Sequence, residues 1–378
     1  MLRQLWLSLE RGKDKLLVGQ ILQKMVADMN RIIKEDCSIW DAEGTCLATT
    51  TPDTSEVAKD VKGLLAIAQN TSMHVTDKTA CFVVSYEGET MYVLAIHNVI
   101  ENVSIVGNLC VNQFDTMVNF YEKRVDCKRF FQQLILDNML LVDMHTQAKK
   151  MNIDVKAKRI VFVIEPKKKG DSLILETLRG IYDNGTQDVV TSVDESHTIL
   201  IKTLSKTDTY DDVNKIAKIL IDTLSMEAMV QVRVAYGNMI GELKDVSKCY
   251  KEANMALDVG KIFYAHRDVL AYNELGIGRL IYQLPYSLCE MFLQEVFHGT
   301  AIEQFDKETL STVNAFFEND LNISETARKM YLHRNTLGYR LDKIQKTTGL
   351  DVKKFEDALT FKIALMVSDH MKFVQSQE

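Results

Sequence analysis

The sequence is poor in the residues that mark several classes of protein. Three prolines in 378 residues, together with the absence of any low-complexity run, exclude a disordered tail or linker. The seven cysteines are odd in number and scattered, without a C-x-x-C pair or a His/Cys cluster of metal spacing. They are expected to be buried, reduced thiols, and we expect neither a metal nor a cofactor.

Long hydrophobic runs are also absent. Arg3 and Glu10 interrupt the apolar opening before a signal-peptide core could form, and no later run approaches the roughly 20 residues of a membrane span. The sequence therefore predicts a cytoplasmic protein without a membrane partner.

No established catalytic motif occurs. G-x-S-x-G, the Walker A loop, the dinucleotide fingerprint and H-E-x-x-H are all missing, so no catalytic residue is assigned. The net charge of −7 argues against nucleic-acid binding over the whole surface, but it leaves room for a local basic patch.

What is present indicates an α+β protein of several domains, because 378 residues exceed one ordinary core. The first third combines a helical pattern at 16–30 with hairpins that turn at Glu43-Gly44 and Glu87-Gly88 and a third strand at 104–114. Apolar residues at helical spacing from about 112 to 151 predict one long connecting helix.

The middle third alternates strands and helices. Strand patterns at 159–165 and 230–237, a hairpin at 188–202, and helical patterns at 171–184, 211–225 and 242–260 follow one another. This order is the β-α-β-β-α-β plan of ferredoxin-like domains.

From about Phe297 the pattern is helical, and it contains two short helices joined by a tight turn. Asn322 stands three residues before Glu325, a capping arrangement that predicts a helix start, and Asn335 is expected to cap the second helix. Leu337, Leu341 and Ile344 mark the inward face of that second helix. The pattern is typical of a helix-turn-helix.

The polar side of the same segment is basic. Residues 322–346 contain six Lys or Arg and two Asp or Glu, a net charge of +4. In the major groove, arginine can donate to guanine while Asn or Thr contacts other base edges or phosphates. The alternative is a solvated basic face on a helical protein-interaction domain.

The segment from Glu325 to Val367 resembles the C-terminal helix-turn-helix domain of PucR/CdaR-type bacterial transcription regulators. The resemblance lies in the run from His333 to Ile344, then "TGLD" and "FEDAL". It implies operator DNA as partner, with contacts from Arg328, Lys329, His333, Arg334, Asn335, Thr336, Tyr339, Arg340 and Lys343. Gly338 departs from the family, which commonly has a larger, often basic residue there.

Residues 232–263 and 269–285 are similar to the end of the central domain of these regulators, which resembles a degenerate GGDEF cyclase. An active cyclase needs a glycine-glycine-acidic hairpin and carboxylates for Mg²⁺. Here the hairpin reads "TSVDESHT", so Asp194 and Glu195 are present without the glycines, and the first strand offers only Glu165. This domain is expected to dimerise or relay a signal rather than to catalyse.

The N-terminal third is similar to the PAS/GAF-like ligand domain of sugar-diacid regulators through "SIWDAEGTCLATT". The following "TPDTSEVAKDVKG" lacks the arginine and histidine that those regulators have there, which argues against a diacid ligand. Tyr86, Tyr92 and His97 are candidate ligand contacts on the later strands, although such residues on a half-buried strand are more often structural.

The predicted architecture is therefore a PAS/GAF-like sensor (1–125), a connecting helix (126–151), a degenerate GGDEF-like domain (152–290) and an all-α helix-turn-helix domain (297–375). We expect a homodimeric, metabolite-responsive DNA-binding regulator that is not an enzyme. A non-DNA adaptor and a nucleotide cyclase using Asp194 and Glu195 are the alternatives.

Overall fold

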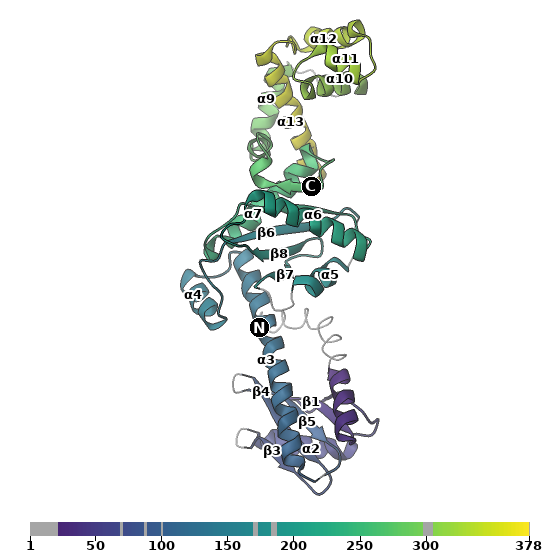
Figure 1. The fold of residues 1–378 in the computed structure, drawn as a ribbon. Coiled ribbons are helices and arrows are strands. Elements are labelled where there is room, and N and C mark those ends of the chain that lie inside the picture. Colours follow the sequence, from purple (N-terminus) through teal and green to yellow (C-terminus); the bar gives the residue numbers. More distant parts are fainter. Residues whose placement is uncertain are drawn as a thin grey trace. The chain divides into compact units, whose positions relative to one another are not determined.

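The computed structural model describes residues 22–68, 71–86, 89–99, 101–168, 173–182, 187–297 and 305–377 (Figure 1). Arg3, Glu10 and the predicted turn at Glu87-Gly88 lie outside these ranges, as does the start of the first predicted helix. The chain divides into two compact units, Met1–Asp126 and Cys127–Glu378.

The first unit contains a five-stranded antiparallel sheet with strand order β2-β1-β5-β4-β3. The strands are β1 (Cys37–Asp41), β2 (Cys46–Thr49), β3 (Met73–Val75), β4 (Ala80–Tyr86) and β5 (Glu89–Ile96). The predicted turn at Glu43-Gly44 is confirmed. Gly44 has a φ of 80°, and the Asp41 carboxylate accepts hydrogen bonds from the backbone N–H groups of Glu43 (3.0 Å) and Thr45 (2.7 Å).

Helices cover both faces of this sheet. Residues 22–33 are helical and pack with the beginning of α3 (Val103–Ile135) on one face, around Ile39, Phe82 and Phe114. Helix α2 (Ser55–Ile67) covers the other face, where Val61 and Leu64 meet Trp40.

Two predictions for the segment that follows were wrong. Residues 104–114 are not a strand but part of α3, because Val103, Gly107 and Phe114 face the sheet at helical spacing. Gly107 lies directly over Phe82, so helix and strand approach closely. The predicted single helix from 112 to 151 is two helices, α3 and α4 (Leu141–Lys150), and Asp137 between them has a φ of 60°.

The second unit contains a sheet of strand order β10-β9-β6-β8-β7, which follows the end of α3 and α4 in the chain. Its elements are β6 (Arg159–Pro166), α5 (Leu173–Tyr182), β7 (Val189–Ser192), β8 (Thr198–Thr203), α6 (Tyr210–Glu227), β9 (Val232–Tyr236), the 3-10 turn η1 (Leu243–Asp245), α7 (Val246–Phe263) and β10 (Val269–Ala271). The predicted β-α-β-β-α-β order is confirmed, and β10 is an additional strand parallel to β9.

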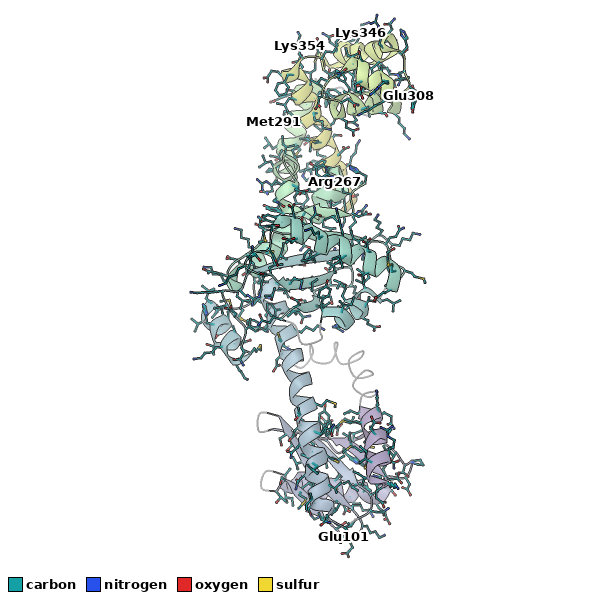
Figure 2. All side chains as sticks on the ribbon, viewed as in Figure 1. Glu101, Arg267, Met291, Glu308, Lys346 and Lys354 are labelled. Atoms are coloured by element: carbon teal, nitrogen blue, oxygen red, sulfur yellow. The ribbon has the colours of Figure 1, made fainter. Side chains whose placement is uncertain are left out.

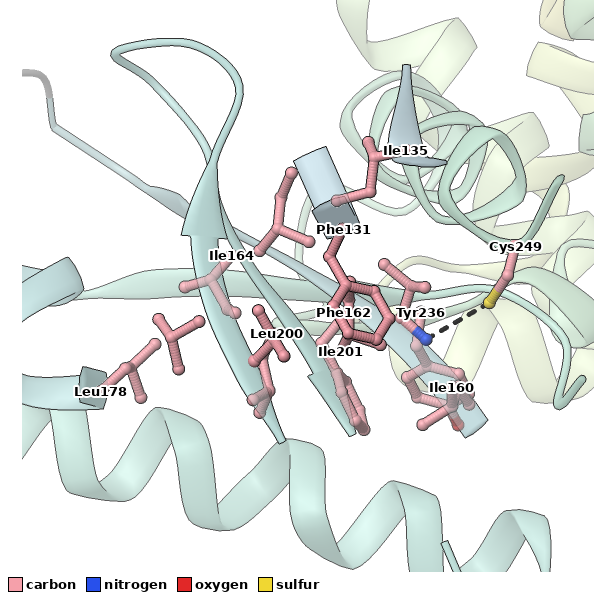
Figure 3. Close-up of a cluster of buried hydrophobic side chains, with 14 of the residues drawn as sticks. Phe131, Ile135, Ile160, Phe162, Ile164, Leu178, Leu200, Ile201, Tyr236 and Cys249 are labelled. Carbon is pink, nitrogen blue, oxygen red and sulfur yellow. Dashed lines mark hydrogen bonds between the residues drawn. The ribbon is translucent and has the colours of Figure 1, made fainter. Parts of the chain in front are cut away.

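The core of this sheet surrounds Phe162 on β6 (Figure 3). Phe131 from the end of α3 joins it, together with Leu200 and Tyr236. The backbone N–H of Val161 donates to the Cys249 sulfur at 3.3 Å, and burial raises the pKa of this thiol to about 12. All seven cysteines are free thiols, as expected, and four of them are buried.

The remainder of the second unit is helical. It comprises η2 (Tyr272–Glu274), α8 (Gly278–Tyr282), α9 (Tyr286–Phe297), α10 (Lys307–Glu318), α11 (Ile323–Lys329), α12 (Arg334–Thr348) and α13 (Phe355–Gln377). Across the described ranges, none of the helices combines the length and hydropathy needed to cross a bilayer.

The contact between Gly107 and Phe82 leads to a prediction. A Cβ at position 107 would lie 2.0 Å from Phe82 Cζ. Gly107→Ala should therefore lower the free energy of unfolding of the first unit by about 1–3 kcal/mol, as overpacking does. Gly63→Ala in α2 is the matched control, because its Cβ would meet nothing within 4 Å. This substitution should raise the free energy of unfolding by up to about 1 kcal/mol. Thermal unfolding of both variants checks this, and equal melting temperatures would contradict it.

Candidate nucleic-acid interface

The helix-turn-helix is held together by the apolar side of α12. Leu337, Leu341 and Ile344 are buried against Val313 and Phe316 of α10 and Ala327 of α11. These are the positions that the sequence pattern assigned to the inward face. The opposite side of α12 therefore faces outward.

The caps of the two helices differ in how well they were predicted. The Asn322 side chain accepts from the Glu325 backbone N–H at 3.0 Å, which confirms the predicted start of α11. The prediction for α12 was wrong by two residues: its N-cap is His333, whose Nδ1 accepts from the Asn335 N–H at 3.3 Å. The imidazole can accept this bond because one of its ring nitrogens carries a lone pair when neutral.

The turn between the helices contains a residue that the sequence reasoning missed. Tyr331 has a φ of 56°, and its side chain is 97% exposed. Its N–H donates to the Arg328 carbonyl at 3.2 Å, and the next N–H, of Leu332, donates to the Ala327 carbonyl at 2.9 Å. This pair of bonds is a Schellman motif, which ends α11. Neither hydropathy nor spacing signals such a side chain.

Four of the predicted DNA contacts lie at the start of α12 and are exposed: His333, Arg334, Asn335 and Thr336. Tyr339 is 70% exposed one turn later, and Lys346 lies farther along the same helix (Figure 2). On α11, Arg328 and Lys329 are exposed, and Arg328 Nη2 lies 2.8 Å from Glu325 Oε1. The structure thus brings these predicted residues together on neighbouring helices.

Arg340 and Lys343 lie differently from the expectation. Arg340 donates to Thr312 Oγ1 at 3.0 Å and to Glu308 Oε2 at 2.5 Å, and its side chain is only 20% exposed. Lys343 Nζ lies 2.5 Å from Asp306 Oδ2, and this bond lowers the pKa of Asp306. Asp306 is also the N-cap of α10, where it accepts from the Thr309 N–H. Both cations are therefore directed to α10.

Two of the three ligand candidates of the first unit, Tyr92 and His97, have described side chains. Tyr92 packs against Phe114 on the α3 face of the sheet, with ring centroids 5.5 Å apart. His97 Nε2 lies 2.8 Å from Ser38 Oγ, which also accepts from Trp40 Nε1 on the α2 face. Tyr92 and His97 thus make separate contacts, and the Tyr86 side chain lies outside what the structure describes.

The second unit places a charged cluster where a cyclase would need its metal. Glu165 at the end of β6 accepts from Lys261 Nζ at 2.6 Å, and His197 Nε2 lies 3.4 Å away. His197 Nδ1 lies 2.8 Å from Asp194 Oδ2. Glu195 is exposed and has no part in this cluster. Among the described residues, no group of three or more metal-ligating side chains is arranged to hold an ion.

The electrostatics of the cluster follow from these contacts. The hydrogen bond with Glu165 raises the pKa of His197 despite burial, and Asp194 contributes in the same direction. Burial alone would raise the pKa of Glu165, but the bonds from His197 and Lys261 outweigh it and lower the pKa. Lys261 and His197 thus bond to the carboxylates that a Mg²⁺ ion would require.

The hairpin above the cluster is closed by its own side chain. The Asp194 carboxylate accepts from the backbone N–H groups of Ser196 and His197, both at 2.7 Å. These donors are therefore engaged and do not point at an incoming phosphate. The missing glycines and the geometry of the turn both argue against phosphate binding at this hairpin.

Further contacts extend from this cluster toward the last helix. Lys261 Nζ lies 3.7 Å from Asp258 Oδ1, and the Tyr282 hydroxyl donates to Asp258 Oδ2 at 2.8 Å. The Tyr282 ring then contacts buried His370 of α13, with ring centroids 5.6 Å apart.

Comparison with known proteins is consistent with this geometry. Residues 309–367 match the PucR C-terminal helix-turn-helix domain, and residues 139–259 match a GGDEF-like domain. The carbohydrate diacid regulator of Escherichia coli is 23% identical over 93% of this chain and 97% of its own length.

Two Bacillus subtilis regulators match over shorter stretches. The purine catabolism regulatory protein is 26% identical over 43% of this chain and 32% of its own length. The DNA-binding transcriptional activator AdeR is 27% identical over 49% of this chain and 44% of its own length. The chain thus spans about a third of the purine catabolism regulatory protein and somewhat under half of AdeR.

The two family matches cover the helix-turn-helix and the preceding domain that contains the Glu165 cluster. The chain therefore has a GGDEF-like domain followed by a PucR C-terminal helix-turn-helix domain, and it is similar to DNA-binding transcriptional regulators of the PucR/CdaR type.

Proposed function

We propose that this regulator binds operator DNA as a homodimer in the cytoplasm and responds to a small-molecule effector. The observation that carries the DNA contact is the exposed start of α12, with Arg334, Asn335 and Thr336 side by side above a buried apolar row. A recognition helix contacts base edges with its N-terminal residues. Two copies would engage two half-sites, so the spacing of the half-sites would follow the symmetry of the dimer.

The residues have different proposed roles. Arg334 reads a base, with Asn335, Thr336 and Tyr339 beside it, while His333, Arg328 and Lys329 meet the phosphate backbone. Arg340 and Lys343 hold α12 on α10, because Glu308, Thr312 and Asp306 already occupy their polar groups. This division revises the expectation that Arg340 contacts guanine.

The first unit is the proposed sensor, of PAS/GAF-like type. Its antiparallel sheet with helices on both faces supports this assignment. Relatives are named for purine catabolism and for carbohydrate diacids, and the lack of Arg and His in residues 51–63 argues against a diacid here. Thermal unfolding of the full chain with purines and with sugar diacids tests the assignment. An unchanged melting temperature with every compound of both classes would count against purines and diacids as effectors.

The GGDEF-like domain is proposed to transmit the signal and not to turn over nucleotide. The cations of Lys261 and His197 on Glu165, and the self-closed Asp194 hairpin, support the absence of Mg²⁺-dependent chemistry. The contacts through Asp258, Tyr282 and His370 supply a physical link to α13. Magnesium-dependent turnover of GTP by the purified chain would contradict this part of the proposal.

Arg334→Ala should relax specificity. If Arg334 donates to a guanine, its loss should cost about 1–3 kcal/mol on operator DNA and much less on shuffled DNA. Lys329→Ala, at an exposed residue of α11 with a proposed phosphate contact, is the control, because loss of a phosphate contact weakens both DNAs alike and reduces the salt dependence. Fluorescence anisotropy with DNA from the gene's own upstream region, at two salt concentrations, measures both. Equal losses on both DNAs for Arg334→Ala would rule out base reading by this residue.

Arg340→Ala should behave differently from Arg334→Ala. It removes the bonds to Glu308 and Thr312, so the helix-turn-helix should melt at a lower temperature and bind operator and shuffled DNA less well by similar factors. Because Glu308 is exposed, the coupling in a double-mutant cycle with Glu308→Ala should be modest, about 0.5 kcal/mol. An unchanged melting temperature combined with lost specificity would restore Arg340 as a base-reading residue.

The cluster on Glu165 should give a pH-dependent stability. His197 has a raised pKa in the folded chain, so its contribution is fully present below its unfolded pKa of about 6.5 and is lost as pH rises through the folded value. The stability difference between the native chain and His197→Gln should be larger below pH about 6 than above pH about 8. Thermal unfolding measures it, with exposed His266→Gln as control. A difference that does not vary with pH would refute the charged state of His197.

A further inference from the structure

Tyr331 occupies a backbone position that suits glycine better than tyrosine. Its φ of 56° places it in the left-handed region, where the Cβ of an L-residue comes too close to the following carbonyl. The C′ position of a Schellman motif is accordingly usually glycine. Helix α12 follows this rule, because it ends at Gly349 with a φ of 80°.

Among the residues that the structure describes, nothing offsets this backbone strain. With 97% of its side chain exposed, Tyr331 buries almost no apolar area, and the two hydrogen bonds of the motif use only backbone atoms. Glycine would form the same bonds at lower cost. A strained, exposed residue is a candidate for a role outside the folded chain where its surroundings supply one.

The surroundings of Tyr331 identify that role. It lies three residues before Arg334, the first residue of α12, at the same end of the helix as exposed His333 and Asn335. In helix-turn-helix proteins this end of the recognition helix enters the major groove, so the preceding turn lies near the backbone that borders the groove. Tyrosine hydroxyls are among the donors to phosphate oxygens in such complexes.

We propose that Tyr331 is a DNA-positioning residue whose hydroxyl donates a hydrogen bond to a phosphate oxygen beside the groove that α12 enters. The proposal rests on the DNA-binding function of this domain and adds a contact to it. Because phosphates are the same in every sequence, the contact sets the position of α12 and carries no base preference.

The test separates binding from stability. Tyr331→Gly should raise the melting temperature of the helix-turn-helix, because the strain is relieved, and should weaken DNA binding about tenfold, the loss expected for one bond to a charged group. If Tyr331 had a purely structural role, Tyr331→Gly would instead lower the melting temperature. Tyr331→Phe keeps the ring and the strain, so it should weaken binding to a similar extent without raising the melting temperature.

Met229→Gly is the matched control. Met229 also has a left-handed backbone, with a φ of 55°, and is 90% exposed, but it follows α6 in the GGDEF-like domain. This variant should gain stability in the same way and bind DNA like the native chain.

The readout is fluorescence anisotropy with a mixed-sequence duplex at low salt, repeated with DNA from the gene's upstream region. The affinity loss of both Tyr331 variants should be the same on the two DNAs. If the native chain binds and both variants bind as tightly as the native chain, the inference on Tyr331 is overturned. If Tyr331→Phe binds normally and only Tyr331→Gly is weakened, the ring and not the hydroxyl makes the contact, which overturns the phosphate bond. If the native chain binds no duplex, the DNA-binding function itself fails.

Discussion

The apolar row of α12 is the constraint on which the proposed DNA-binding surface depends. Leu337, Leu341 and Ile344 must be buried together, and a helix with one side buried has only one direction in which to present its remaining side chains. The side chains of Arg334 and Asn335 are therefore turned outward. The bonds from Arg340 and Lys343 to α10 add a polar connection beside this row. Packing and charge together fix how α12 would approach the groove.

The GGDEF-like domain contains a cluster of charged side chains that bond to one another. A metal site needs carboxylates that are free to bind a cation, and here side chains of the same domain supply the cations. Lys261 and His197 both reach Glu165, and Asp194 bonds to His197 and to its own turn. A nucleotide with Mg²⁺ would have to displace several charge-assisted hydrogen bonds. The cluster instead connects the end of β6, the β7–β8 hairpin and α7.

Several features could be predicted because their signals are local. The alternation of strands and helices in the second unit, the start of α11 at Asn322 and the turn at Gly44 each depend on a few neighbouring residues. The strand predicted at 104–114 was wrong for a tertiary reason: this segment is helical, and its Gly107 lies directly over Phe82 of the sheet. Similarly, the break at Asp137 between α3 and α4 was not visible in a pattern that continues at helical spacing on both sides.

The sequence by itself determined the class of the protein: the inward row of α12, the basic residues around it and the order of elements before it are all periodic or compositional features. It also indicated that the cyclase glycines are missing. Only the tertiary structure decided which cations face outward, because Glu308 and Asp306 precede Arg340 and Lys343 by more than thirty residues. It likewise separated Tyr92 from His97 and revealed Tyr331, since exposure and backbone strain arise from the packing of distant segments and leave no local pattern.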